Sequence, residues 1–600
     1  MGDQKNLFLA IGLALIVLTI YQFLVVEPAA KQRLAAREAQ LILEEQSPQT
    51  TDPAVQLASQ VGQQALASSP KITIDNAALD GSFSTYGGRF NDLFLKDYRE
   101  ELDPNSAEVR LLDPQLSRGG EFAMFGWRAA DEGANNTLPG LETSWQVVRG
   151  DLLAPGAPVE LSYTNQEGLV FHRHIAIDDQ YMFTIIDTVS NQGTETRTIR
   201  PFGQVRKYGD PSRLPKDATA LEKRKLRGNF VSHQGVIGAV GGEQMKHSYK
   251  KIRNGGDTQS GVGGWVGFTS KYWLTAVIAP ADEQIEAKTR MFRSSTGEDV
   301  FEASFLGAPR EVAPGTRTEV TLQLFAGAKK VKILKGYETN QNIARFDTAI
   351  DWGLFWFLTR PYFVVLDWLY GIFGNFGLAI MALTVIIKAI FFPLANKSYA
   401  SMARMKALQP KMEEIKAAHK GDAQTLQQET MALYKREKAN PLGGCLPILL
   451  QIPVFFALYK TLYISLEMRH APFYGWIRDL SEPDPTAFGN LFGLINWDPN
   501  TLPILGAVLA VGIWPLLMGC TMAAQQLLNP PAPDPIQRKI FAFMPVVFTI
   551  MMAPFAAGLV IYWTWNNFLS LIQQYIITRK HGVETPFDRL FVRVFGGEKN

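Results

Sequence analysis

The sequence predicts an α-helical membrane protein that crosses the bilayer several times and carries one large all-β domain. Three regions indicate this fold: residues 1–26 form an N-terminal transmembrane anchor, residues 71–335 alternate like β-strands, and residues 377–578 contain long apolar runs. Charged residues make up 19% of the 600 residues, below the roughly 25% usual in soluble proteins. We therefore expect an anchor helix, a β-sandwich and a helical core of five spans.

The anchor rests on twenty almost wholly apolar residues, Leu7 to Val26, which are long enough to span a hydrocarbon core of about 30 Å. A cleaved signal peptide is the alternative, but the run is long for one and no small-x-small cleavage site follows it. Residues 27–70 contain no aromatic residue and are rich in Ala, Gln, Glu and Ser. We expect them to form a flexible linker.

The β-domain is indicated by period-2 alternation over residues 71–335, for example through Ile175, Ile177 and Phe183. Turn signals such as Asn191-Gln192-Gly193 recur between the alternating segments. The pattern is typical of one large antiparallel β-sandwich.

Residues 351–376 hold ten aromatic residues, interrupted by Arg360, Pro361 and Asp367. Amphipathic rings favour the boundary between headgroups and acyl chains, so we expect an amphipathic helix lying in the membrane interface. A short span is the alternative, and it would change the topology by one crossing.

Lys388 is a cation within the apolar run from Gly377 to Leu394. A charge near the centre of a span costs roughly 2.5 to 3.5 kcal/mol on insertion scales, which makes it a functional candidate. Snorkelling is the alternative, because Leu394 lies only about 9 Å further along a helix and the lysine stem can lift its ammonium toward the headgroups. We favour a polar intramembrane site.

Residues 397–438 are charged, break at Gly421-Asp422 and are expected to form a helical hairpin in water. Apolar residues recur at helical spacing in the first half of this segment: Met402, Met405, Met412 and Ile415. Two interpretations of this face remain, ordinary internal packing or an adaptable contact surface for apolar partners.

Three further apolar runs follow, at residues 442–466, 502–528 and 540–577. As a single helix the last run would be about 57 Å long, nearly twice the hydrocarbon core. It must therefore fold back, and Pro554 to Gly558 is the expected turn. The core then has five spans, and the anchor makes six.

Lys and Arg gather in cytoplasmic loops, so loop charges predict the orientation. Residues 397–440 hold nine Lys and Arg, whereas residues 467–500 hold only Arg469 and Arg478. The hairpin is therefore expected in the cytoplasm, together with both termini and the tail at residues 579–600. Three basic residues that follow the first anchor disagree with this assignment, and we follow the later loops.

Several function classes lack support in the sequence. A balance of 59 basic and 57 acidic residues gives a net charge of +2, which argues against specific nucleic-acid binding. Cys445 and Cys520 both lie in apolar runs, so no disulfide framework is expected in the β-domain. His172 and His174 share a strand face without a third ligand nearby, which favours two surface histidines over a metal site. No Walker-type loop occurs, and we expect no cofactor and no catalytic activity.

A family resemblance covers most of the chain. It is carried by KSYASMARMKALQPKM, by ETMALYKREKANPLGGCLPILLQIPVFFALY, and by DPIQRKIFAFMPVVFT with GLVIYW. These runs resemble the YidC membrane protein insertase family, bacterial relatives of the Oxa and Alb insertases. The β-domain is similar to the periplasmic domain of Gram-negative members, which is related in fold to sugar-binding supersandwiches.

The resemblance implies a five-helix insertase core in the inner membrane, with a hydrophilic groove open to the cytoplasm and to lipid but closed toward the periplasm. Lys388 occupies the position of the family's groove cation, which is usually Arg, so strict bidentate binding of carboxylates is in doubt. The other matching groove residues are Thr384, Gln451, Gln526 and Trp563, where Trp563 replaces a common Tyr.

The expected clients are nascent membrane proteins, inserted without nucleotide hydrolysis. The groove shortens the path over which a polar tail is unsatisfied, and Lys388 attracts acidic tails. The client's apolar segment then leaves along residues 442–466 and 540–555. Pro447, Ile452 and Phe455 form the predicted slide on the first of these segments. The implied partners also include the Sec translocon (SecYEG and SecDF), the translating ribosome and the lipid bilayer.

Two other function classes remain open. A small-solute transporter would use a midplane charge in a similar way, but no internal repeat is evident in the core. A sugar-active sandwich enzyme would need a constellation of carboxylates or histidines that the sequence does not offer.

Overall fold

The computed structural model describes residues 64–130, 137–211, 213, 232–294, 297–419, 422–437, 446–495, 497, 499, 502, 505–530 and 535–588. The predicted anchor, most of the predicted linker and the end of the predicted tail lie outside these residues. The chain divides into two compact units, and the smaller one combines Met1–Ser68 with Arg293–Gly297. The β-domain and the helical core belong to the larger unit.

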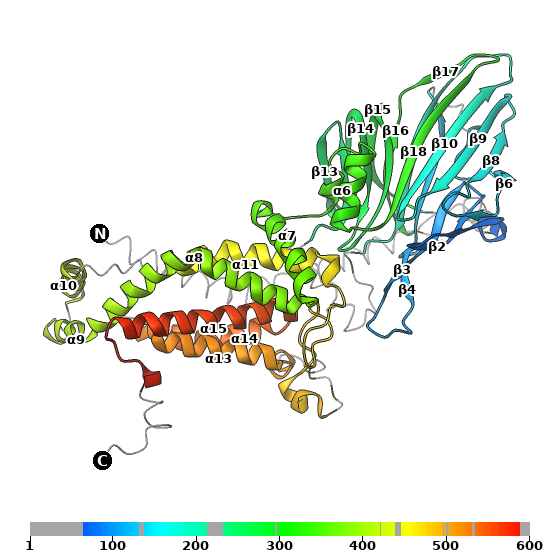
Figure 1. The fold of residues 1–600 in the computed structure, drawn as a ribbon. Helices are drawn as coiled ribbons and strands as arrows, with labels where there is room; N and C mark the ends of the chain where they lie inside the picture. The colour runs from blue at the N-terminus through cyan, green and yellow to red at the C-terminus, as the bar shows by residue number, and fades with distance from the viewer. Residues whose placement is uncertain are drawn as a thin grey trace, which may run out of the picture. The chain divides into compact units, whose positions relative to one another are not determined.

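Eighteen strands among the described residues form the predicted β-domain and belong to one hydrogen-bonded sheet (Figure 1). They are β1 (Lys71–Asp75), β2 (Leu79–Ser84), β3 (Arg89–Arg99), β4 (Glu108–Leu112), β5 (Glu121–Ala129), β6 (Gln146–Arg149), β7 (Leu152–Leu153), β8 (Val159–Thr164), β9 (Leu169–Ile177), β10 (Met182–Asn191), β11 (Arg197–Tyr208), β12 (Gly235–Val240), β13 (Glu243–Ser248), β14 (Asp257–Thr269), β15 (Trp273–Arg293), β16 (Asp299–Leu306), β17 (Arg310–Val312) and β18 (Arg317–Ala328).

Strand pairing follows two series. One series runs β6–β8–β9–β10–β18–β15–β14–β12–β13. The other runs β7–β1–β2–β3–β5–β11, and both β16 and β17 pair with β11. These pairings are antiparallel except that of β1 with β7, so the predicted antiparallel architecture is confirmed.

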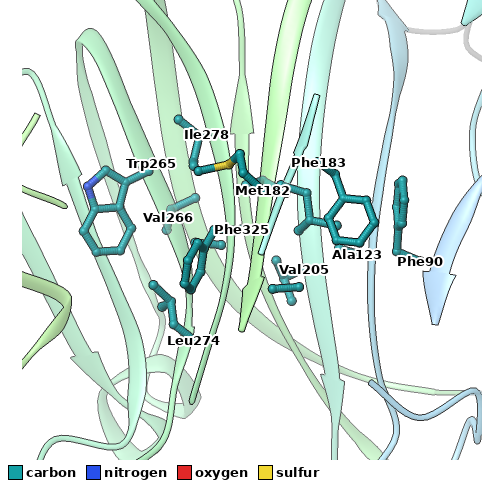
Figure 2. Close-up of a cluster of buried hydrophobic side chains, with 14 of the residues drawn as sticks. Phe90, Ala123, Met182, Phe183, Val205, Trp265, Val266, Leu274, Ile278 and Phe325 are labelled. Atoms are coloured by element: carbon teal, nitrogen blue, oxygen red, sulfur yellow. The ribbon is translucent and has the colours of Figure 1, made fainter. Parts of the chain in front are cut away.

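The two series pack against each other through large apolar side chains. Phe90 on β3 and Phe183 on β10 meet edge to face with ring centroids 5.0 Å apart, and Figure 2 shows these rings with Ala123 and Val205 close by. Along β10 buried and partly buried residues alternate. Period-2 alternation thus places one face of the strand in the core, as the sequence predicts.

A buried ion pair fixes the alignment of the two series. Arg173 on β9 donates from Nε and Nη2 to Asp187 on β10 at 2.7 Å each, and both side chains are only 1% exposed. From β5, Trp127 Nε1 donates to Asp187 Oδ2 at 3.0 Å, and the carbonyl of Phe125 accepts from Arg173 Nη2 at 3.2 Å. A shift of either series would leave a buried charge unpaired, which is costly.

Helices follow the β-domain, apart from the short α5 (Tyr249–Arg253) within it. They are α6 (Val331–Asn340), η4 (Phe346–Ala349), α7 (Trp356–Phe373), α8 (Phe376–Ala407), α9 (Gln409–Ala418), α10 (Ala423–Arg436), α11 (Leu446–Ile464), η6 (Leu466–Met468), η7 (Phe488–Gly493), α12 (Gly506–Leu509), α13 (Ile513–Leu528), α14 (Pro535–Met552) and α15 (Ala557–Lys580).

Helix α7 is the predicted amphipathic helix. Its inner face buries Phe363, Leu366 and Leu369, while Val364 and Trp368 are 64% and 62% exposed. A helix with one packed face and one exposed aromatic face suits the membrane interface. Gly374 ends the helix in a left-handed conformation with φ of +63°.

Helix α8 contains the predicted span with Lys388 and continues beyond it to Ala407. Among the described helices it is the one that is long and apolar enough to cross a membrane. The charged segment from Lys397 therefore begins as an extension of this helix, and the hairpin proper is α9 and α10. Asp422 starts α10 by accepting from the backbone N–H groups of Gln424 and Thr425, whereas Gly421 lies outside the described residues.

The predicted turn in the last apolar run is confirmed, because α14 ends at Met552 and α15 begins at Ala557. The run 502–528 behaves differently, and its long helix α13 begins only at Ile513. Two side chains of the preceding loop cap this start: Asp484 Oδ2 accepts from Trp514 N at 2.9 Å, and Thr486 Oγ1 accepts from Ile513 N at 3.0 Å. A distant cap of this kind leaves no local signal in the run itself.

Internal packing explains part of the predicted methionine face. Met402 and Met405 are each 8% exposed and cluster with Tyr399, Leu408 and Ile577. In the β-domain, His172 is exposed on β9, and no group of three or more His, Cys, Asp or Glu side chains suited to a metal occurs among the described residues.

Asp351 joins the β-domain to the helical core. Its carboxylate binds Lys246 of β13 at 2.9 Å and Lys460 of α11 at 2.7 Å, and it accepts from the backbone N–H of His233 at 3.1 Å. Burial raises the pKa of Asp351, but the two lysines outweigh burial and hold that pKa below its usual value.

Candidate functional site

Lys388 lies twelve residues, about 18 Å, along α8 from its first residue. Its ammonium donates to Ser570 Oγ of α15 at 2.5 Å. Ser570 Oγ in turn donates to the carbonyl of Asn566 at 2.8 Å. No carboxylate of the described residues lies within 4.0 Å of Lys388, so its charge has a neutral partner. Helices α8 and α15, which carry this contact, lie side by side (Figure 1).

A stripe of polar side chains, the α15 polar stripe, accompanies Ser570 along its helix. It comprises residues at a spacing of four along one face, together with one neighbour: Asn566, Asn567, Ser570, Gln574 and Thr578. All five are at most 8% exposed. Polar side chains buried in a helical core require hydrogen-bond partners, because an unpaired one costs about 1 to 3 kcal/mol.

Several of these partners are missing. Gln574 Nε2 donates to Asn529 Oδ1 at 2.8 Å, but Gln574 Oε1 is buried without a partner. The buried Nδ2 of Asn567 and Nε2 of Gln573 also lack one. Unpaired donors and acceptors close to an uncompensated cation suit an environment that holds water.

The other predicted groove residues divide into two groups. Thr384 is 1% exposed, and its hydroxyl donates to the carbonyl of Ile380 in its own helix. The hydroxyl proton of Thr384 is therefore used within α8. Gln451 of α11 donates from Nε2 to the hydroxyl of Tyr562 on α15. Gln526 is partly buried on α13, and no side-chain hydrogen bond links it to Lys388 or to the α15 polar stripe.

Trp563 belongs to an aromatic cluster. Its ring lies 4.5 Å from that of Phe455 on α11 and 6.0 Å from that of Phe548 on α14. The neighbouring Tyr562, 1% exposed, supplies the hydroxyl that contacts Gln451. Trp563 therefore bridges three helices through apolar contacts.

Sequence reasoning missed Ser570, Tyr562 and the polar stripe. A signal for the stripe exists, because Asn566, Ser570, Gln574 and Thr578 recur every four residues inside an apolar run. Such a stripe marks one helix face, but it does not identify the residue that this face meets.

The predicted slide is partly described. Ile452 on α11 is 45% exposed, whereas Phe455 packs against Trp563 and Phe456 is 49% exposed. Pro447 lies in α11, but its side chain is outside the described part of the chain. On α14, Phe543 and Val546 are 67% and 57% exposed. Both helices thus present apolar side chains outward.

Comparisons with known proteins cover nearly the whole chain. A family model described as 60Kd inner membrane protein matches residues 368–584, and one described as YidC periplasmic domain matches residues 71–365. A Maricaulis maris protein named membrane protein insertase YidC is 46% identical over 602 residues, covering 99% of this chain and 98% of that protein.

A Caulobacter vibrioides protein of the same name is 44% identical over 628 residues, covering 99% of both chains. Among solved structures, one described as an active YidC insertase with its first transmembrane domain resolved covers 87% of this chain and 98% of that chain. Its sequence identity is 16% and its TM-score is 0.35.

Proposed function

Because this chain belongs to the YidC membrane protein insertase family, we propose that it inserts nascent proteins into the inner membrane by way of the polar face around Lys388. The family is one of insertases rather than of catalytic enzymes, and the chain is an inner-membrane protein with a periplasmic domain. The parts proposed are the polar groove, its cation and the path of the client.

The observation that carries the proposal is the neutral environment of Lys388. A lysine paired with a carboxylate would have its charge compensated, but this ammonium contacts only the Ser570 hydroxyl among the described side chains. Unpaired polar atoms of Asn567 and Gln574 lie on the same helix as Ser570. Together they support a hydrated, positively charged groove that is available to a client.

The groove acts on acidic tails by electrostatic attraction. At 4 Å, a carboxylate gains about 1 kcal/mol from Lys388 in water and about 4 kcal/mol at an effective dielectric constant of 20. Energies of this size suit transient capture, because a tighter complex would hold the tail in the groove. The client's apolar segment then moves along the exposed side chains of α11 and α14 into lipid, and burial of that segment supplies the free energy.

This mechanism requires no nucleotide. It agrees with the proposed topology, in which the hairpin of α9 and α10 and both termini are cytoplasmic. The Sec translocon and the translating ribosome are the proposed delivery partners.

Reconstituted insertion tests the role of Lys388. One small client is prepared with zero, one or two acidic residues in its translocated tail and is added to vesicles containing Lys388→Arg, Lys388→Ala or Lys388→Glu at matched protein levels. Lys388→Arg is expected to retain insertion. Lys388→Ala is expected to slow it at least about fivefold for each acidic residue, since about 1 kcal/mol is lost per charge. Lys388→Glu is expected to be worst for acidic tails.

Lys406→Ala is the matched control, because Lys406 lies on the same helix and also donates to neutral oxygens, the carbonyls of Leu527 and Leu528. Helix integrity alone predicts another order, with Ala best tolerated and Glu and Arg both costly. Equal insertion of all three clients by Lys388→Ala and the parent protein would refute the electrostatic mechanism.

A further inference from the structure

A pocket of about 430 Å³ lies where β12 and β13 meet the segment that runs from η4 into α7. Its lining includes Lys246 of β13, Arg345 just before η4, Asp351, Trp352 and Arg360 of α7. Small-ligand sites usually measure roughly 300 to 1,000 Å³, so the pocket has the volume of a binding site.

The lining carries an excess of positive charge. Asp351 is its carboxylate, and that group is already engaged by Lys246 at 2.9 Å and by Lys460 at 2.7 Å. Arg345 is exposed, and its Nη1 donates to the carbonyl of Gly242 at 2.9 Å. No carboxylate in the described part of the chain lies within 4.0 Å of Arg345, so its charge is free to meet an anion.

Two buried N–H donors in the lining also lack acceptors. They are Nε of Arg360 and Nε1 of Trp352, and the Arg360 guanidinium lies 5.5 Å from the centre of the Trp352 ring. Nη2 of Arg360 binds Asp347 at 3.1 Å, which holds the guanidinium in place. Both nitrogens have almost no accessible surface, whereas the Arg360 side chain as a whole is 40% exposed, so the outer nitrogens of its guanidinium are the atoms that a ligand in the pocket reaches.

The exposed face of α7 continues from the same pocket. Trp356 lines the pocket and is 57% exposed, and Phe357, Val364 and Trp368 are 55%, 64% and 62% exposed along the helix. Aromatic side chains of this kind lie at the level of the lipid headgroups. A ligand of this pocket would therefore combine an anionic group with apolar chains.

We propose that the pocket binds the phosphate of an anionic phospholipid, phosphatidylglycerol, whose acyl chains follow the exposed face of α7. The planar guanidinium groups of Arg345 and Arg360 suit phosphate oxygens, which accept two parallel hydrogen bonds. The bound lipid joins the β-domain to the membrane surface independently of Lys388.

Native mass spectrometry of the full chain in detergent, titrated with phosphatidylglycerol, tests this site. Arg345→Gln removes the uncompensated charge at an exposed position. We expect phosphatidylglycerol affinity to fall about tenfold in this variant. Arg149→Gln, an exposed arginine of β6, is the matched control and should bind as the parent does.

The second part of the experiment repeats the titration with inorganic phosphate and with phosphatidylcholine. The pocket should bind both far more weakly than phosphatidylglycerol, since phosphate lacks acyl chains and choline adds a cation. If inorganic phosphate binds as tightly as phosphatidylglycerol, a free-anion site replaces the lipid site. If Arg345→Gln, shown to be folded by its thermal unfolding, binds phosphatidylglycerol as Arg149→Gln does, the proposal is overturned.

Discussion

Replacement of Asp351 by Asn should loosen the junction between the β-domain and the helical core. The substitution keeps the size of the side chain but removes the charge that Lys246 and Lys460 share. The side chain of Lys460 is only 9% exposed, so its ammonium loses, in a largely buried place, the carboxylate that it contacts at 2.7 Å. Breaking a buried pair in this way costs roughly 3 to 5 kcal/mol, whereas the 40% exposed Lys246 adds at most about 1 kcal/mol.

Hydrogen exchange followed by mass spectrometry measures this loss locally. A loss of about 3 kcal/mol should make the amides of β13 and of residues 345–355 exchange about a hundredfold faster. Asp347→Asn is the matched control, because Asp347 is 20% exposed against 19% for Asp351 but pairs with the 40% exposed Arg360 alone. Its effect should stay near fivefold, the size expected for a partly exposed pair.

A double variant separates charge from packing. Asp351→Asn with Lys460→Met removes both members of the buried pair and should recover most of the lost protection. Equal exchange in Asp351→Asn and Asp347→Asn, or a double variant that exchanges as fast as the Asp351 single variant, would refute the assignment of Asp351 as the junction's buried counter-ion.

Two further outcomes follow from groups outside the pocket and the groove. Burial lowers the pKa of His233 to about 4, so the unfolded chain binds a proton between pH 6.5 and 4 that the folded chain excludes, and stability should fall by about 3 kcal/mol as pH falls through this window. His233→Gln should flatten the decline in Tm between pH 7 and pH 4.5. Asp351 does not contribute to this decline, because its lowered pKa affects stability only at lower pH. An unchanged decline in the variant would contradict the assignment of the pH dependence to His233. The topology is tested with single cysteines after Cys445 and Cys520 are replaced. A cysteine at Glu429 should react with a membrane-impermeant maleimide only from the cytoplasmic side, and one at the 61% exposed Tyr474 only from the periplasmic side. Labelling of both from one side would contradict the proposed topology.

The sequence predicts well those features that depend on local residue spacing or segment length. Alternation around Ile175 and Phe183 predicts the antiparallel strands, the excessive length of residues 540–577 predicts the turn between α14 and α15, and the aromatic residues after Asp351 predict α7. Each follows from a spacing or a length, which the chain carries whatever its tertiary contacts are.

The features that sequence reasoning missed depend on contacts between distant segments. The pairing of Lys388 with Ser570 depends on how α8 and α15 are rotated against each other, and a helical period does not fix that rotation. The start of α13 depends on Asp484, nearly thirty residues earlier. Gln451 and Trp563 are both predicted groove residues, but the hydrogen bond of Gln451 goes to Tyr562, whose side chain is turned by about 100° from that of Trp563 around the same helix.

The length of α8 has a mechanical consequence. Pro393 interrupts its hydrogen-bond ladder, because proline has no N–H to donate, and this makes Pro393 the natural pivot of a 32-residue rod. Lys388 lies about 7.5 Å from the pivot on one side and Ala407 about 21 Å from it on the other. A bend of about 10° at this point moves Ala407 by about 4 Å relative to the part of the helix that carries Lys388. The hairpin of α9 and α10 is therefore free to shift while Lys388 keeps its contact with Ser570.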